Sequence, residues 1–259
     1  MPQSDAAKEP RVPAAGPEQA PERLGLVIPT LHEAGNIGAL LERVCTALEP
    51  MGVPFEILVV DDDSRDGTVE TVAAVAAADP RVRLLVRKGE RGLSGAVIDG
   101  WQRTGASILG VMDADLQHPP ELLPELLRAI LRGRDLAIGS RYAHCGCLGE
   151  WSGMRRAISI AAVWATRPLQ KRRLMARDPM SGFFLVRRRC VANVAFQRTG
   201  FKLLLEILVR GRVRSVEEIP FRFGQRHAGA SKASAKVAWE YGRLLAKLYL
   251  GRYLLWSRV

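Results

Sequence analysis

The stretch L-G-L-V-I-P-T-L-H-E-A-G-N-I, residues 24–37, joins a short apolar run to the start of a helical pattern. The apolar run has the length and composition of a buried strand. Apolar residues then recur at the spacing of one helix face, at Leu40, Leu41, Val44 and Leu48. Asn36 is of a type that caps helices. The sequence therefore predicts a strand over 24–30 and a helix from Asn36 to Leu48.

The same strand–helix unit repeats outward from this stretch. Further strands are expected in F-E-I-L-V-V (55–60), V-R-L-L-V (82–86), S-I-L-G-V-M-D (107–113) and D-L-A-I-G-S (135–140). Helical patterns lie between them, over 67–78 and 93–104 and after Pro119-Pro120. Strands that alternate with helices at this spacing are typical of an α/β fold with a mainly parallel central sheet flanked by helices.

The alternation loosens after Tyr142 and the chain becomes basic. We expect a helical stretch over 151–175, strands in 181–188 and 213–220, a short helix over 201–210 and a C-terminal amphipathic helix from about Ser231. Residues 1–22 are rich in Pro, Ala, Glu and Gln, which is typical of a disordered leader. The predicted organisation is a leader (1–22), one domain (23–230) and the amphipathic helix (231–259).

Charge is unevenly distributed along the chain. Residues 23–140 carry 12 basic and 17 acidic residues, whereas residues 141–259 carry 24 basic and six acidic ones. This division predicts a cation-dependent site in the first part and an anionic surface or substrate for the second. The sequence has no apolar run of the roughly 20 residues that a membrane span needs. Its four cysteines favour a reducing compartment over a disulfide scaffold.

Carboxylates follow three of the expected strands. Glu33 lies just past the first strand, Asp61–Asp63 follow the second, and Asp113 and Asp115 follow the fourth. Ligands of open α/β sheets bind at the carboxyl ends of strands. In extended geometry Asp113 and Asp115 point the same way and can face one cation. Hard oxygen ligands suit Mg²⁺ or Mn²⁺, which also binds nucleotide phosphates, and Gln117 offers a further oxygen. His118 is interpreted as a polar loop histidine.

Six segments in order resemble family 2 glycosyltransferases of the GT-A nucleotide-sugar-binding fold, and among them the polyprenyl-phosphate (dolichyl-phosphate) mannosyltransferases. They are V-I-P-T-L-H-E-A-G-N-I, V-V-D-D-D-S-R-D-G-T, M-D-A-D-L-Q-H-P-P, G-S-R-Y, D-P-M-S-G-F-F-L-V and F-x-x-R-x-x-G-x-S-K. The match runs from about Leu24 to at least Lys232. A D-x-D motif alone is common, but all six segments in this order are specific.

The resemblance implies a role for each matching position. A nucleotide-sugar site is implied for Pro29, Leu31, Glu33, Val60, Asp62, Asp113, Ala114, Asp115, Gln117, Arg141, Lys202, Arg226 and Lys232. Within it, Asp113, Asp115 and Arg141 are the implied catalytic residues, and Asp113, Asp115 and Gln117 the implied ligands of Mg²⁺ or Mn²⁺. Leu31 departs from the family, which commonly has an aromatic residue there.

The implied activity is transfer of mannose from GDP-mannose to a polyprenyl (dolichyl) monophosphate with inversion. A metal ion and basic groups stabilise the charge that develops on a leaving diphosphate. The implied location is a cytosol-facing membrane surface, which is the endoplasmic reticulum in a eukaryote and the plasma membrane in a prokaryote. Small membrane subunits are possible partners, and no nucleic acid is expected.

The basic second part of the chain has two further interpretations. Arg155, Arg156 and Ser159 lie on or near one helical face and are predicted to hold the acceptor phosphate. Arg172, Arg173 and Arg187–Arg189 are predicted to be surface charges near anionic lipid headgroups. The C-terminal helix, with Leu244, Leu248, Tyr249, Leu255 and Trp256 beside Arg243, Lys247 and Arg252, suits either a membrane interface or packing against the sheet.

Three other functions remain open from the sequence. The nearest is a polyprenyl-phosphate transferase that uses UDP-glucose or UDP-N-acetylglucosamine. An aspartyl-phosphate hydrolase is more distant, because Gln117 stands where that chemistry usually has Thr or Val. A nucleic-acid binder would use the basic part of the chain, but it leaves the acidic strand ends unexplained.

Overall fold

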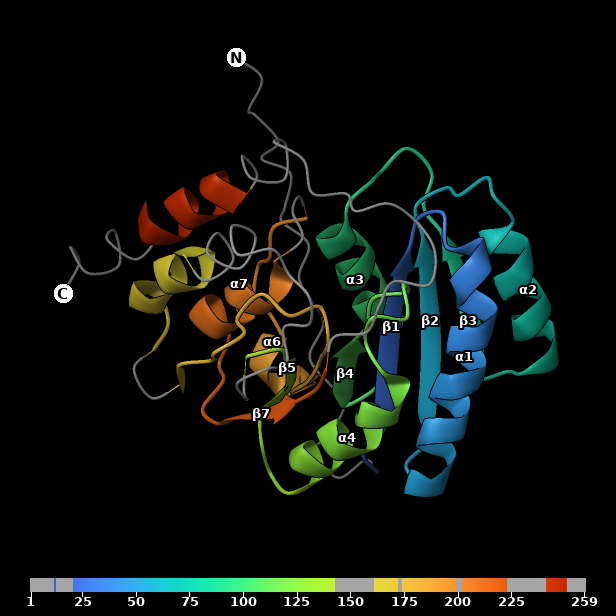
Figure 1. Ribbon diagram of the computed structural model, residues 1–259, viewed down its shortest axis with the longest axis horizontal. Coiled ribbons are helices and arrows are strands. Elements are labelled where there is room, and N and C mark those ends of the chain that lie inside the picture. The colour runs from blue at the N-terminus through green and yellow to red at the C-terminus, as the bar shows by residue number, and fades with distance from the viewer. Residues whose placement is uncertain are drawn as a thin grey trace, which may run out of the picture.

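One central sheet organises the part of the chain that the structure, a computed structural model, describes: residues 12, 21–142, 161–171, 174–198, 202–222 and 241–250 (Figure 1). Its strands are β1 (Leu24–Thr30), β2 (Phe55–Asp61), β3 (Val82–Val86), β4 (Ile108–Val111), β5 (Leu136–Ser140), β6 (Phe184–Arg187) and β7 (Val216–Pro220). Their order in the sheet is β3-β2-β1-β4-β6-β5-β7. The predicted strands are all present, and the α/β fold with a mainly parallel sheet is confirmed.

One strand runs against the others. β6 is antiparallel to both of its neighbours, β4 and β5, whereas the β1–β2, β1–β4, β2–β3 and β5–β7 pairs are parallel. In the parallel part, Thr30 lies opposite Asp61, and Val27 lies opposite Val111. The carboxyl ends of β1, β2 and β4 therefore meet at one edge of the sheet, where the acidic residues were expected.

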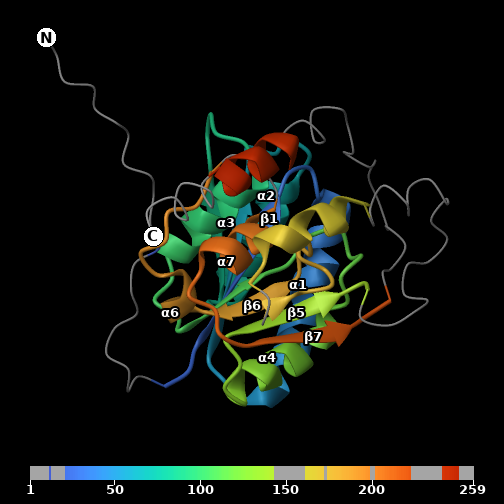
Figure 2. The same cartoon turned by 90° about the vertical axis from the view of Figure 1, so that its left-hand side faces the viewer.

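Helices cover both faces of the sheet (Figures 1 and 2). The helices are α1 (Ala34–Leu48), α2 (Thr68–Ala78), α3 (Leu93–Gln102), α4 (Leu123–Leu131), α6 (Arg188–Val191) and α7 (Leu203–Arg210), and residues 161–166 and 241–250 are also helical. Short 3₁₀ turns are η1 (Glu49–Met51), η2 (Pro120–Leu122) and η3 (Arg167–Leu169). α1 begins two residues before the predicted Asn36. Asn36 is buried in its first turn and is not the cap.

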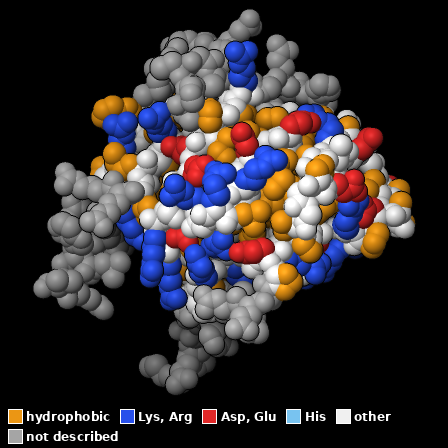
Figure 3. All heavy atoms as spheres, turned by 90° about the horizontal axis from the view of Figure 1, so that it is seen from below, with side chains coloured by type: hydrophobic (Ala, Val, Ile, Leu, Met, Phe, Trp, Pro, Cys, Tyr) orange, Lys and Arg blue, Asp and Glu red, His pale blue; other side chains and the backbone are white. Residues whose placement is uncertain are grey.

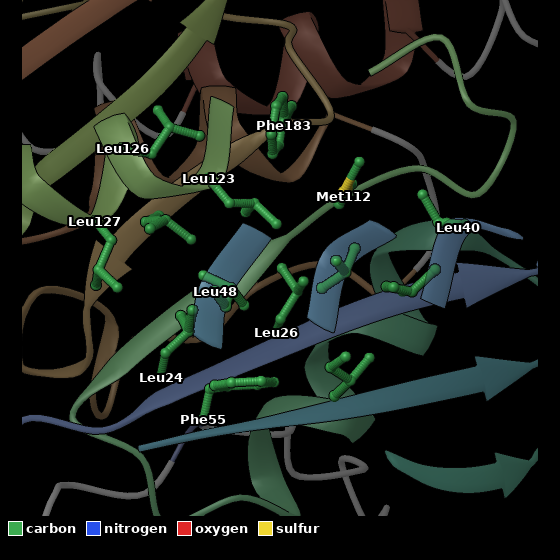
Figure 4. Packing of buried hydrophobic residues seen from close by; sticks show 14 of the residues in the cluster. Leu24, Leu26, Leu40, Leu48, Phe55, Met112, Leu123, Leu126, Leu127 and Phe183 are labelled. Carbon is green, nitrogen blue, oxygen red and sulfur yellow. The ribbon is translucent and has the colours of Figure 1, made fainter. Parts of the chain in front are cut away.

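Alternate residues of the strands pack on opposite faces. Leu24, Leu26 and Ile28 join the cluster beneath α1 and α4, whereas Val27 joins the cluster beneath α3 and α7. Figure 4 shows the first cluster, in which Leu48 of α1 lies close to Leu26. This alternation is the expected pattern of a sheet that is buried on both faces.

The described part of the C-terminal helix, residues 241–250, packs against the protein. Leu244 and Leu248 are buried with Leu169 and with Leu205 of α7. The hydroxyls of Tyr241 and Tyr249 donate hydrogen bonds to the carbonyls of Ala162 and Ala165, both at 2.7 Å. The segment thus packs on α7 and on residues near Leu169, and not directly on the sheet as one prediction had it; the membrane-interface placement stays a prediction. Leu255, Trp256 and Arg252 lie outside the described residues.

Basic side chains gather on the face of the molecule that Figure 3 shows. The surface interpretation is nevertheless wrong for Arg188, which is buried and donates hydrogen bonds to the carbonyls of Ala106 (2.6 Å) and Thr104 (2.9 Å) near the end of α3. Arg187 is also largely covered and pairs with Glu22. Arg189 is exposed and pairs with Asp135 at 3.0 Å. Helix-terminal carbonyls are natural partners for a buried guanidinium.

The predicted domain boundaries are not tested by these contacts. Val12 is fully buried and bridges Ala192, although it belongs to the range expected to be a disordered leader. In the described part of the chain, no helix combines the length and the apolar character needed to cross a bilayer.

Candidate active site

The loops that follow β1, β2 and β4 share an uncommon backbone conformation. Each contains one non-glycine residue with positive φ: His32 (61°), Asp63 (62°) and Leu116 (59°). The left-handed conformation costs of order 1–3 kcal/mol for such residues and persists where the surrounding structure holds it. Strained residues of this kind concentrate at functional sites, and here they gather at the edge where the acidic residues meet.

The D-A-D-L-Q segment separates its polar and apolar side chains. Met112, Ala114 and Leu116 contact the core cluster beneath α1 and α4. Asp113, Asp115 and Gln117 alternate with them and are partly exposed. β4 ends at Val111, so these residues form a loop, and yet the period of two that was predicted for the pair of aspartates continues. The buried apolar residues thus anchor the loop that carries both carboxylates.

Asp113 is the most perturbed carboxylate among the described residues. Its side chain is 34% exposed, yet its Oδ1 atom is buried and accepts no hydrogen bond from any described residue. Burial raises the pKa of Asp113 to about 7, and the nearby charges of Asp115 and Glu33 act in the same direction, whereas Lys202 and Arg141 oppose them. A buried carboxylate oxygen that accepts no hydrogen bond is chemically suited to a cation.

Two residues fix the surroundings of the Asp113 carboxylate. A Cβ atom built on Gly182 would lie 2.5 Å from Oδ2 of Asp113, so only glycine fits there without a shift. Nδ1 of His118 lies 3.7 Å from the same oxygen. His118 is 3% exposed and stacks near the rings of Phe183 (5.2 Å) and Phe221 (5.5 Å). The polar-loop interpretation of His118 is therefore wrong.

Burial also sets the charge of His118. It lowers the pKa of the imidazole to about 4, although the negative charges of Asp115 and Asp178 act against this shift. The ring is therefore neutral at neutral pH. The neutral ring packs against Phe183 and Phe221 and in this way supports the loop that carries Asp113.

Arg141 is oriented by a residue that sequence reasoning did not assign. Nε and Nη2 of Arg141 donate to the two oxygens of Asp178 at 2.7 and 2.8 Å, and its backbone N–H donates to Oδ2 at 3.1 Å. Asp178 is fully buried, and its own N–H donates to Glu218 at 3.0 Å. Hydrogen bonds to Asp178 raise the pKa of Arg141, against the effect of burial. The available signal was the D-P-M-S-G segment, which lies 37 residues after Arg141.

Lys202 joins the same group of charges. It precedes α7 as its N-cap residue. Burial lowers the pKa of its ammonium group to about 8, and the positive charge of Arg141 adds to this, whereas Asp113 and Asp178 oppose it. The structure therefore brings together Asp113, Asp115, Arg141 and Lys202, four of the predicted site residues. Two carboxylates beside two cations suit a ligand that combines a metal ion with phosphates.

The predicted residues on β1 and β2 have other contacts. The side chain of Val60 is fully buried in the cluster beneath α3, so only its backbone can reach a ligand. Pro29 pairs with it across the sheet. Glu33 accepts a hydrogen bond from Asn36 Nδ2 at 2.8 Å, and Leu31 is half-buried.

Asp62 is engaged by neighbouring protein groups. Its Oδ1 accepts from Arg87 Nε at 2.8 Å, and its Oδ2 accepts from the N–H of Gly92, also at 2.8 Å. Asp61 is buried and accepts from Thr30 Oγ1 (2.6 Å) and from the N–H of Ser64 (2.7 Å). The acidic triplet thus stabilises its own loop through Asp61 and Asp62.

Several predicted residues lie outside the described residues. They are Arg155, Arg156 and Ser159 of the acceptor site, and Arg226 and Lys232 of the nucleotide-sugar site. Their roles stay predictions.

A cavity of about 350 Å³ lies beside Tyr142 and is also lined by Trp164, Arg167, Met175 and Arg177.

The donor set fits a divalent cation that is only partly held by protein. Among the described residues, no group of three His, Cys, Asp or Glu side chains encloses a metal position. Mg²⁺ is commonly bound by one or two carboxylates and completed by substrate phosphates and water. Asp113, whose buried Oδ1 accepts no hydrogen bond from a described residue, and Asp115 match that requirement.

Comparison with known proteins identifies the relatives of this chain. A family model described as Glycosyl transferase family 2 matches residues 26–194. A dolichol-phosphate mannosyltransferase of Saccharomyces cerevisiae is 39% identical over 239 residues, which cover 88% of this chain and 87% of the relative. One of Pyrococcus furiosus is 42% identical over 226 residues, which cover 87% of this chain but 63% of the longer relative.

A solved structure shares the fold at low sequence identity. Glucosyl-3-phosphoglycerate synthase from Mycobacterium tuberculosis, in complex with Mn²⁺, UDP and glucosyl-3-phosphoglycerate, superposes with a TM-score of 0.63 and is 18% identical. The match covers 89% of this chain and 80% of that structure. The sheet is thus that of the GT-A fold. Together with the family match over residues 26–194, this shows that the chain belongs to glycosyl transferase family 2.

Proposed function

We propose that this chain transfers mannose from GDP-mannose to a polyprenyl monophosphate at a membrane surface, with inversion at the anomeric carbon. The observation that carries the proposal is the group of Asp113, Asp115, Arg141 and Lys202 at the sheet edge, in a chain similar over most of its length to dolichol-phosphate mannosyltransferases. The acceptor and the sugar are taken from the names of those relatives. The donor nucleotide and the inversion are inferred from chemistry and from the family resemblance.

Asp113 and Asp115 are the residues that would hold Mg²⁺ or Mn²⁺, with Gln117 as a further oxygen. When bound, such an ion neutralises charge on the diphosphate. The M. tuberculosis structure with Mn²⁺ and UDP, and another of that enzyme with Mg²⁺ and UDP, support a divalent ion in this fold.

The cationic side chains supply the second part of the chemistry. As the bond between the anomeric carbon and the diphosphate breaks, negative charge grows on the leaving GDP. In this proposal Arg141 and Lys202 stabilise that charge from fixed positions. Asp178 holds the guanidinium of Arg141 in one orientation, so little reorganisation is needed during the reaction.

The acceptor requires little activation. The second pKa of a phosphate monoester is near 6, so the acceptor phosphate is largely ionised at neutral pH. One of its oxygens attacks the anomeric carbon while GDP leaves from the opposite side, which inverts the configuration. This accounts for a site whose buried histidine, His118, is neutral and packs between aromatic rings.

The experiment is a transfer assay with a polyprenyl monophosphate in detergent or vesicles, supplied separately with GDP-mannose, UDP-glucose and UDP-N-acetylglucosamine. We expect a mannosyl lipid from GDP-mannose alone, with the anomeric configuration opposite to that of the donor. A product from a UDP-sugar instead would replace the donor assignment, and retained configuration would overturn the single displacement. Incorporation of donor phosphate into Asp113 would favour a hydrolase.

A further inference from the structure

A chain of alternating charges runs from the loop after β2 to the segment before Lys202. We define the charge network as Asp62, Arg87, Asp99, Arg198 and Glu90. Arg87 bridges Asp62 (2.8 Å) and Asp99 (3.1 Å). Both oxygens of Asp99 then accept from Arg198, from Nη1 and Nη2 at 2.8 Å each. This bidentate geometry fixes both the distance and the orientation of an arginine.

The network is buried where it is central and exposed at its far end. The side chains of Arg87, Asp62 and Asp99 are 6%, 8% and 12% exposed, whereas those of Arg198 and Glu90 are 32% and 60% exposed. Within the network, Asp99 pairs with two arginines, Arg87 and Arg198. Loss of Arg198 leaves Asp99 paired with Arg87, so the buried carboxylate keeps a partner.

A glycine of α3, Gly95, allows the backbone at Arg198 to lie against this helix. A Cβ atom added to Gly95 would lie 3.2 Å from the carbonyl oxygen of Arg198, and one added to Gly92 would lie 3.5 Å from it. The same Cβ on Gly95 would lie 2.7 Å from Nη1 of Arg87. Gly95 thus admits both arginines, whereas Gly92 has a φ of 141°, which itself favours glycine.

The segment before Lys202 is also tied to α7. The N–H of Gln197 donates to Oε2 of Glu206 at 3.1 Å, and Glu206 is buried in the first turn of α7. The N–H of Glu206 in turn donates to the carbonyl of Lys202, at 3.4 Å. α3 and α7 cover the same face of the sheet (Figures 1 and 2), and the pair Gln197-Arg198 contacts both helices, five and four residues before Lys202.

We propose that Arg198 is a positioning residue, which holds Lys202 in place for the donor diphosphate through its ion pair with Asp99. Four residue steps separate Arg198 from Lys202, so their Cα atoms are at most about 14 Å apart. An anchor this close in the chain restricts where Lys202 can lie. This inference rests on the proposed function, because it takes a nucleoside diphosphate as the ligand that Lys202 meets.

The test is a double-mutant cycle with GDP and guanosine as probes, in the presence of Mg²⁺, measured by calorimetry on the full chain. Lys202→Gln is expected to weaken GDP binding about 10- to 100-fold, as for loss of a charge-assisted hydrogen bond. Arg198→Gln is expected to weaken it about three- to tenfold, and the double variant no more than Lys202→Gln alone. Guanosine, which has no phosphate, is expected to bind all of these chains equally.

The matched control is Arg81→Gln. Arg81 makes a similar bidentate pair with Asp79 (3.0 and 2.7 Å) in the turn between α2 and β3, and its removal is expected to leave GDP affinity unchanged. Arg198→Lys keeps the charge without the bidentate geometry and is expected to give an intermediate loss. It also replaces Arg198→Gln in the cycle if the latter does not fold.

The outcomes separate the two proposals. Wild-type chain that binds neither GDP nor UDP would overturn the proposed function and this inference with it. The positioning role is wrong, and the proposed function stands, in either of two cases in which wild-type chain binds GDP. In the first, the losses of GDP affinity in Arg198→Gln and Lys202→Gln add in the double variant. In the second, the Arg198→Gln variant binds GDP as tightly as wild type. An equal loss of guanosine binding would likewise assign Arg198 to general structural support.

Discussion

Gly182 lies so close to Asp113 that a Cβ atom at this glycine would be 2.5 Å from one carboxylate oxygen and 2.8 Å from the other. The contact joins the segment before β6 to the loop after β4, and these two strands are antiparallel neighbours. The chain reversal at β6 thus brings a backbone without a side chain against the carboxylate that the proposed cation needs.

Gly182→Ala is therefore expected to displace Asp113. We expect at least a tenfold loss of sugar transfer and of Mg²⁺-dependent GDP binding, since a charge-assisted contact of about 1.5 kcal/mol or more is lost. The measurements are turnover and calorimetric GDP affinity. Gly105→Ala is the control, because a Cβ atom at Gly105 meets nothing within 4 Å. Equal behaviour of the two variants would contradict the role of this contact.

Asp178→Asn is expected to damage both stability and activity. Asp178 is fully buried and Arg141 is 15% exposed in its side chain, so the variant leaves a largely covered guanidinium without its counter-charge. Breaking a buried pair from one side costs about 3–5 kcal/mol. Urea unfolding measures the stability, and the transfer assay measures the loss caused by a disoriented Arg141.

Asp79→Asn serves as the control for Asp178→Asn. The Asp79–Arg81 pair has comparable hydrogen bonds but side chains that are 23% and 35% exposed. Its loss is expected to cost less than about 1 kcal/mol. A similar loss of stability in both variants would show that burial of the Arg141–Asp178 pair has no special effect.

The affinity for GDP is expected to fall at alkaline pH because of Lys202. Its pKa is lowered to about 8 in the ligand-free protein, mainly by burial. A diphosphate favours the ammonium form and raises this pKa, so affinity is complete below pH 8 and declines as pH rises toward the pKa of the complex. Calorimetry between pH 7 and 9.5 measures the decline. Lys202→Arg, which stays charged, is expected to flatten it, and a persistent slope would point to another group.

Substitutions of Leu116 test whether the left-handed backbone at this position constrains the loop after β4. Its φ of 59° disfavours β-branched side chains, and Leu116 also packs against the core. Leu116→Ile is expected to destabilise the protein by about 1–2 kcal/mol and to reduce transfer, whereas Leu116→Met keeps an unbranched Cβ and should remain close to wild type. Thermal unfolding and turnover are the measurements. Equal tolerance of Ile and Met would show that the left-handed turn is not constrained.

The sequence was most informative where the pattern is local. Strand and helix positions follow from periodicity within a dozen residues, and the Asp113–Asp115 pair follows from its place at the end of a strand. The contacts that orient these groups join distant parts of the chain. Asp178 lies 37 residues from Arg141, and the carbonyl of Ala106 lies 82 residues from the buried Arg188. Burial of His118 likewise depends on Phe183 and Phe221, which come from elsewhere in the chain.

Asp62 shows a second limit of sequence reasoning. Its position after β2 identified the sheet edge. The same position does not reveal that Arg87, 25 residues later, donates a hydrogen bond to its carboxylate. An acidic residue at a strand end can bind a ligand or stabilise the loop that does so. Only the positions of the cationic side chains distinguish these roles.

The proposed role of Asp113 and Asp115 is to hold a divalent ion for a nucleotide-sugar diphosphate. It is tested most directly by measuring mannosyl transfer from GDP-mannose to a polyprenyl monophosphate with wild-type chain and Asp115→Ala, each with Mg²⁺ and with excess chelator. We predict transfer by wild type with Mg²⁺, its loss on chelation, and a collapse in Asp115→Ala that added Mg²⁺ does not restore. Near-normal turnover of Asp115→Ala, or transfer by wild type that is unaffected by the chelator, would contradict this metal-binding role.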